Sequence, residues 1–227
     1  MRKALKETLR SLYEAMLKDE DISVLSEQDY CCMAPYVGNK YPKEKNEGVI
    51  FYGRANNGWR GGVNCDYDYI YDNGAEGLTD YIKDNRSPFF RTAGKAFSNF
   101  YGEDWYEYVT YSNLYKVAPP VGNPGQSVCD SQWKYITDIF SKEIEVLSPR
   151  FVVLYTNENW GMDFLLHLNK EVNPQVLSTR EWAGYHINVY KIGDVYFLLT
   201  EHPQGKPEWE HAAAILSVIE NVKEGVL

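Results

Sequence analysis

The chain has 227 residues, 44% of them apolar, and a formal net charge of −9. A chain of this length and composition can bury a complete core, so we expect one domain over residues 1–227. The acidic balance argues against sequence-blind wrapping of a nucleic acid, since such binding depends on Lys and Arg neutralising phosphates.

No segment approaches the roughly 20 apolar residues of a membrane-spanning helix, and the N-terminus lacks the apolar core of a signal peptide. We therefore expect a cytoplasmic protein that does not contact a membrane. The four cysteines are few, and Cys31 and Cys32 are adjacent, which favours reduced thiols over a disulfide framework. No C-x-x-C spacing occurs, so no metal site is predicted.

Along the first third of the chain, apolar residues at helical spacing predict an amphipathic helix over residues 3–18. This N-terminal helix, within residues 1–20, is expected to pack on the domain. A short apolar run at residues 48–52 ends abruptly at Gly53 and predicts a buried strand. Residues 63–86 have poor periodicity, and we expect only a short helix there, around residues 77–82.

The middle of the chain alternates between helices and strands. Helices are expected at residues 92–101, 127–147 and 160–169, and strands at 106–114 and 151–155. The run at 151–155 is apolar throughout, which is typical of a parallel strand covered on both faces.

Near the C-terminus, strands at residues 186–191 and 195–200 flank Ile192-Gly193-Asp194, which indicates a hairpin or a tight bend. A last helix begins at Pro207 and places Trp209, Ala212, Leu216 and Ile219 on one face. Strands that alternate with helices predict an α/β fold, a three-layer αβα sandwich around a mostly parallel central sheet. Such sheets bind ligands at the carboxyl ends of their strands.

Polar residues suited to ligand binding follow three of the predicted strands. The loop from Gly53 carries Arg54, Asn56 and Asn57, and it is either a ligand-binding loop or an ordinary Gly-Asn turn. Asn113 ends another strand, where its amide either binds a nucleobase edge or caps a turn.

The third strand exit carries His202 between Glu201 and Pro203. An imidazole at this position can donate a hydrogen bond to charge that develops on a substrate, although a lone loop histidine is more often structural. The remaining histidines, at positions 167, 186 and 211, are interpreted as structural. Six cations fall in or beside these segments and favour a small cationic site on an acidic body: Arg54, Arg60, Arg91, Lys95, Lys116 and Lys206.

The chain has no Walker loop, nucleophile elbow or G-x-G-x-x-G motif, which argues against the common NTPase, hydrolase and dinucleotide-binding classes. The order of several short motifs is more informative. These are Gly53-Arg54-Ala55-Asn56-Asn57-Gly58, residues 87–95 (SPFFRTAGK), residues 112–120 (SNLYKVAPP), Asn123-Pro124, Cys129, Leu147-Ser148-Pro149 and His202-Pro203. In this order they resemble the uracil-DNA glycosylase superfamily over roughly residues 48–222, with family 4 the nearest pattern.

Proteins of that superfamily extrude a damaged base from DNA and cleave its N-glycosidic bond with water. The resemblance implies that Asn113 reads the base edge and that Phe89 or Phe90 is the stacking ring. It also implies that His202 stabilises the departing base. The loop from Gly53 and Arg54, with Asn56 and Asn57, would hold the water. Lys116 and Lys206 would contact phosphates of DNA or of a nucleotide-like ligand.

The chain departs from the family pattern in its first motif, where Arg54 and Ala55 replace the usual acidic residue or Asn. A guanidinium does not act as a base at neutral pH. The attacking water would then be positioned by Asn56 or Asn57, or it would be activated by the carboxylate of Asp66, Asp68 or Glu201.

The iron–sulfur ligands of family 4 are also incomplete. Val117 stands where that branch has a Cys, and only Cys129 matches a ligand position. We therefore expect no iron–sulfur cluster and no cofactor. Three functions stay open: a DNA-repair N-glycosylase, a catalytically silent module that binds nucleic acid or a small ligand, and a protein-interaction domain with an idle cleft.

Overall fold

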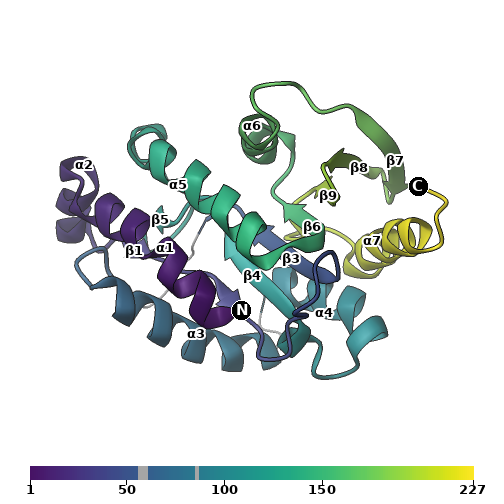
Figure 1. Ribbon diagram of the computed structural model, residues 1–227, viewed down its shortest axis with the longest axis horizontal. Coiled ribbons are helices and arrows are strands. Elements are labelled where there is room, and N and C mark those ends of the chain that lie inside the picture. Colours follow the sequence, from purple (N-terminus) through teal and green to yellow (C-terminus); the bar gives the residue numbers. More distant parts are fainter. Residues whose placement is uncertain (56–60, 85–86) are drawn as a thin grey trace.

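The computed structural model describes residues 1–55, 61–84 and 87–227, without the side chains of residues 74–77. In this part of the chain, helices surround one large sheet (Figure 1). The helices are α1 (Arg2–Lys18), α2 (Glu20–Ser23), α3 (Tyr67–Lys83), α4 (Pro88–Tyr101), α5 (Gln126–Leu147), α6 (Glu158–Leu168) and α7 (Glu208–Lys223), with 3₁₀ turns η1 (Val24–Gln28) and η2 (Trp105–Tyr108). The strands are β1 (Cys31–Cys32), β2 (Tyr36–Val37), β3 (Gly48–Gly53), β4 (Val109–Asn113), β5 (Val117–Ala118), β6 (Pro149–Tyr155), β7 (Val176–Trp182), β8 (Tyr185–Ile192) and β9 (Val195–Thr200).

The described residues form a seven-stranded sheet in the order β2-β4-β3-β6-β9-β8-β7, and β1 pairs separately with β5. The four central strands β4, β3, β6 and β9 are parallel, whereas β2, β8 and β7 join antiparallel. The α/β prediction is confirmed, but the sheet is mixed and not mostly parallel. The antiparallel pairs follow from short connections. A tight turn at Ala183-Gly184 joins β7 to β8 and another at Gly193 joins β8 to β9, and all three turn residues have positive φ.

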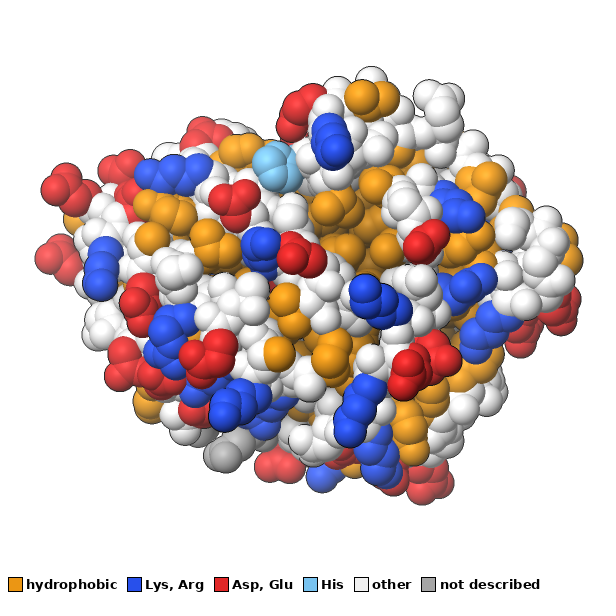
Figure 2. All heavy atoms as spheres, viewed as in Figure 1, with side chains coloured by type: hydrophobic (Ala, Val, Ile, Leu, Met, Phe, Trp, Pro, Cys, Tyr) orange, Lys and Arg blue, Asp and Glu red, His pale blue; other side chains and the backbone are white. Residues whose placement is uncertain are grey.

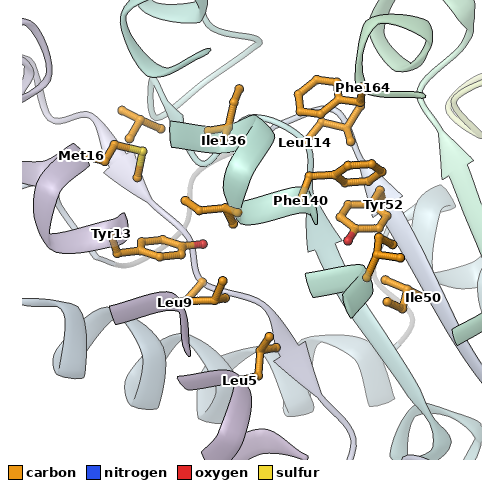
Figure 3. Close-up of a cluster of buried hydrophobic side chains, with 14 of the residues drawn as sticks. Leu5, Leu9, Tyr13, Met16, Ile50, Tyr52, Leu114, Ile136, Phe140 and Phe164 are labelled. Carbon is orange, nitrogen blue, oxygen red and sulfur yellow. The ribbon is translucent and has the colours of Figure 1, made fainter. Parts of the chain in front are cut away.

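Both faces of the sheet are covered. Alternate residues of β3 point to opposite sides, so Ile50 and Tyr52 join one apolar cluster while Val49 and Phe51 join another. The first cluster includes side chains from α1, α5 and α6, among them Tyr13, Phe140 and Phe164 (Figure 3). The second includes side chains from α4 and α7.

Most predicted elements are present, including the amphipathic helix α1, the long helix α5 and the strands β3, β4, β6, β8 and β9. The expectation for residues 63–86 is wrong, because α3 extends from Tyr67 to Lys83. Its buried face combines tyrosines with aliphatic residues: Tyr67, Ile70 and Tyr71 near its start and Leu78 and Ile82 later. Among the helices described, none is both long enough and apolar enough to cross a membrane.

Candidate functional site

The parallel strands end at matching levels along one edge of the sheet. Gly53 of β3 is paired with Asn113 of β4, and Tyr155 of β6 is paired with Thr200 of β9. His202 follows Thr200 by two residues. Gly53, Asn113 and His202, which were singled out from the sequence, therefore lie at or just after the edge where open α/β sheets bind ligands.

Phe89, near the start of α4, connects these strand ends. Its ring centre lies 6.0 Å from that of His202 and 5.1 Å from that of Tyr155. A β-carbon at position 53 would lie 3.3 Å from Phe89 Cε2 and would collide with Asn113 Oδ1, so a glycine is required there. These contacts bring Gly53, Phe89, Asn113 and His202 together.

Phe90, the other candidate stacking ring, belongs to the core. It is 2% exposed and lies edge-on against Phe51 and Tyr111. Phe89 is also buried, at 7% exposed, and packs on the same two rings, so the two phenylalanines differ in the additional contact that Phe89 makes with the His202 ring. Phe89 is the ring that lies beside His202.

The Asn113 side chain is fully buried. Tyr111 Oη donates a hydrogen bond of 3.0 Å to Asn113 Oδ1, and Asn113 Nδ2 lies 2.9 Å from Met33 Sδ. Tyr111 stands two residues earlier on the same strand and therefore on the same face, which is the signal in the sequence that indicates this bond. A nucleobase that reaches Asn113 has to displace these two contacts.

His202 is half-buried, and its imidazole is held in one form. Burial, with the positive charges of Arg54 and Lys206, lowers the pKa of His202 to about 4. The ring is therefore neutral at pH 7. The backbone N–H of Gln204 donates to Nδ1 at 3.2 Å, so the proton lies on Nε2 and His202 can donate from that atom.

Two cations lie close to His202, and both already have partners. Arg54 Nε donates to the Thr156 carbonyl at 2.9 Å, and the guanidinium lies 5.8 Å from the Trp160 ring centre. Lys206 Nζ is 3.6 Å from Glu201 Oε2. These bonds fix the positive charges beside the imidazole and help to keep it neutral.

Lys116 does not reach the surface, so its expected contact with a phosphate is wrong. Its side chain is 1% exposed, and Nζ donates to Ser112 Oγ, the Asn113 carbonyl and Glu143 Oε1 at 2.7, 2.7 and 2.8 Å. Burial lowers the pKa of Lys116, and the Glu143 carboxylate opposes this shift. The pair instead joins α5 to the end of β4.

The residues proposed to handle water differ in how they are placed. Asn56 and Asn57 lie outside the described residues. Asp66 caps α3 by accepting a hydrogen bond from the Tyr69 N–H at 2.7 Å, and Asp68 pairs with Arg10 of α1 at 2.8 Å. Of the three candidate carboxylates, Glu201 is the one that lies beside His202 in sequence and is ion-paired to Lys206.

Comparison with models of known protein families gives no match, and a search of curated proteins gives none either. The roles of these residues therefore rest on their geometry and chemistry.

Trp209 was expected on the buried face of the last helix, and this expectation is wrong. Its side chain is 70% exposed, whereas Ala212 and Ile219 are buried. Lys95 Nζ lies 5.2 Å from the Trp209 ring centre, and Glu208 holds both Arg91 and Lys95. The buried positions of α7 begin at His211 and Ala212 and are centred roughly 140° around the helix from residue 209, so Trp209 lies outside the buried face.

His211 is structural, as interpreted from the sequence, but it has a partner in the site. It is completely buried, and Nε2 lies 3.0 Å from Thr200 Oγ1. Thr200 ends β9 and also accepts backbone hydrogen bonds from residues 156 and 157. His211 therefore closes the base of the loop that carries His202.

All four cysteines are free thiols, and burial raises the pKa of Cys129 to about 11. Within residues 1–55, 61–84 and 87–227, His, Cys, Asp and Glu side chains form no group of three that could hold a metal ion. Charges of both signs are interspersed on the face shown in Figure 2, without one broad basic surface.

Proposed function

We propose that this chain is a three-layer αβα protein of the uracil-DNA glycosylase type, a single domain that binds a nucleobase of DNA or of a nucleotide. The observation that carries the proposal is the contact of Phe89 with both the Gly53–Asn113 strand end and His202. An aromatic ring, an amide and an imidazole N–H donor then lie within one site, which is the set of groups that stacking and edge recognition of a base require.

In this proposal His202 is the catalytic residue. Cleavage of an N-glycosidic bond leaves negative charge on the departing base, and a neutral imidazole donates its Nε2 proton in a hydrogen bond to that base. Because the pKa of His202 is lowered to about 4, the ring that donates this hydrogen bond at pH 7 is the uncharged imidazole. Water then adds to the sugar carbon, positioned by Asn56 or Asn57 or deprotonated with help from Glu201.

The remaining cations are suited to contacts with the phosphates of a few nucleotides. Arg91 and Lys95 on α4 share Glu208, so this group carries a net charge of about +1 beside the exposed Trp209 ring. Lys206 adds a cation that is partly neutralised by Glu201. Such a surface is suited to a few nucleotides around the extruded base and not to a long duplex footprint.

A second candidate, a catalytically silent binding module, is favoured by one observation. The Asn113 amide is buried and engaged by Tyr111 and Met33, so the edge that should read a base is already covered. A protein that has kept the fold and lost excision tolerates such closure, whereas an enzyme must open it for each turnover.

The test is incubation of the pure protein with oligonucleotides that carry uracil, hypoxanthine, xanthine or alkylated bases, followed by hot alkali to reveal abasic sites. If the enzyme proposal is correct, at least one oligonucleotide is cut. His202→Ala then lowers the cleavage rate about a hundredfold or more. His167→Ala, on α6 with a side chain that is 36% exposed, is the matched control and should retain activity.

The other outcomes separate the alternatives. Binding without cleavage, weakened by a His202→Ala variant that still unfolds cooperatively, supports the silent module. Absence of both cleavage and binding contradicts the proposal and leaves the protein-interaction domain.

A further inference from the structure

Three aromatic side chains from different elements meet beneath the His202 loop. His211 of α7 is completely buried, and its ring stacks on Trp182 of β7, with centres 3.9 Å apart and planes 9° from parallel. Tyr155, at the end of β6, meets the same His211 ring edge-on, with centres 5.3 Å apart. The Tyr155 ring also contacts Phe89, so this group lies directly behind the proposed site.

Each of the three rings carries a polar atom that has no hydrogen-bond partner in the described part of the chain. These atoms are Tyr155 Oη, Trp182 Nε1 and His211 Nδ1. Buried polar atoms in folded proteins almost always have partners. Two other buried tyrosines follow this rule, since Tyr13 Oη donates to the Met33 carbonyl and Tyr52 Oη to Glu143. The three atoms therefore each need a hydrogen-bond partner, and the contacts between their rings place them in one part of the core.

The hydrogen bonds already present determine whether each of these three atoms acts as a donor or as an acceptor. Thr200 Oγ1 donates its proton to the His186 carbonyl at 3.4 Å, so it accepts from His211 Nε2. Burial lowers the pKa of His211 to about 3, so the ring has one proton, which this bond places on Nε2. His211 Nδ1 is then an acceptor, whereas Trp182 Nε1 is a donor and Tyr155 Oη can donate.

We propose that Tyr155, Trp182 and His211 enclose a binding site for one internal water molecule. Water accepts hydrogen bonds from Trp182 Nε1 and Tyr155 Oη and donates one to His211 Nδ1, which gives the three bonds typical of buried water. The lone pair on Nδ1 disfavours an anion, and the N–H of Trp182 disfavours a metal ion.

The inference is independent of the proposed function, and it explains how the His202 loop is supported. His211 joins Thr200, the residue before the loop, to α7, the helix after it. A water on Nδ1 satisfies the other side of this imidazole and so holds the ring in the orientation that the bond to Thr200 needs.

The sign of a stability change tests the proposal. If water bridges Tyr155, Tyr155→Phe removes a formed hydrogen bond, and the unfolding equilibrium constant in urea should rise roughly three- to tenfold. The matched control is Tyr13→Phe, which removes the bond to the Met33 carbonyl and should change the constant in the same direction. An unchanged or smaller constant for Tyr155→Phe means that its hydroxyl had no partner, and this overturns the proposal.

A high-resolution crystal structure of the unaltered protein gives a second test that needs no variant. We expect an ordered solvent peak about 2.6–3.2 Å from both Tyr155 Oη and His211 Nδ1. Absence of a peak at that point overturns the proposal even if the protein is destabilised by Tyr155→Phe.

Discussion

The buried pair of Lys116 and Glu143 shows how a single charged residue can be structural in this protein. Both side chains are almost completely excluded from solvent, and the carboxylate also accepts from Tyr52 and Ser112. Two charges out of water are stable only because every donor and acceptor around them is used. Removal of one partner therefore costs far more than the pair contributes.

We predict that Glu143→Leu lowers the free energy of unfolding by about 3–5 kcal/mol, since it leaves an ammonium group buried without its counter-charge. The double variant Lys116→Met/Glu143→Leu should be more stable than this single variant, because no buried charge remains. Urea denaturation of the unaltered protein, the single variant and the double variant measures these differences in the free energy of unfolding. Glu145→Ala breaks the exposed pair with Lys142 and serves as the control that should change little. A double variant less stable than Glu143→Leu would contradict this account.

At the scale of elements, α3 is a helix that hydrophobic periodicity alone did not predict at its full length. Two of its buried positions, Tyr67 and Tyr71, are tyrosines, which also occur in loops, and the Asp and Asn residues between the buried positions favour turns as readily as helices. Tertiary contact decides the outcome, because Lys6 and Arg10 of α1 bind the exposed carboxylates of α3 while Tyr67 packs on Tyr13. The apolar runs of β3 and β6 contain no such ambiguity and were predicted correctly.

The start of α3 gives a prediction for Asp66, which the sequence also suggested as a catalytic carboxylate. Asp66→Ala should lower the free energy of unfolding by about 1 kcal/mol, because the Tyr69 N–H loses its cap. Asp66→Asn keeps an acceptor and should retain most of the stability. Thermal unfolding monitored by circular dichroism measures both. If Asp66→Asn instead folds normally and abolishes an excision activity, Asp66 is catalytic and not only a cap.

Across the whole molecule, the sequence predicted the alternation of helices and strands and the strand ends on which the candidate site lies. The turn residues 192–194 indicated the hairpin that pairs β8 with β9, whereas no strand was predicted for β7, and its antiparallel pairing with β8 through the turn at Gly184 was missed. The burial of Lys116 depended on Glu143, 27 residues away and on another element. Long-range pairing of this kind leaves no local pattern in the sequence. The end of a buried strand does leave one, because an apolar run stops at a glycine or a polar residue.

The half-buried His202 and the buried His211 predict how the stability of the fold changes in acid. Burial lowers the pKa of His202 to about 4 and that of His211 to about 3, and the charges of Arg54 and Lys206 at His202, and of Lys206 at His211, lower them further. An unfolded His titrates near about 6.5. Between pH 6.5 and 4.5 the unfolded chain therefore binds up to two more protons than the folded protein, and stability falls as the pH falls.

The slope of the unfolding free energy should approach about 2.7 kcal/mol per pH unit near pH 5, and His202→Asn should reduce it by about half, since one proton is removed from the difference. Urea denaturation at several pH values measures these slopes. The unaltered protein, measured at the same pH values, gives the reference slope. If His202→Asn also keeps that slope, then His202 is not held neutral by its surroundings, and the hydrogen-bond donor on which the proposed chemistry depends is protonated well above pH 4.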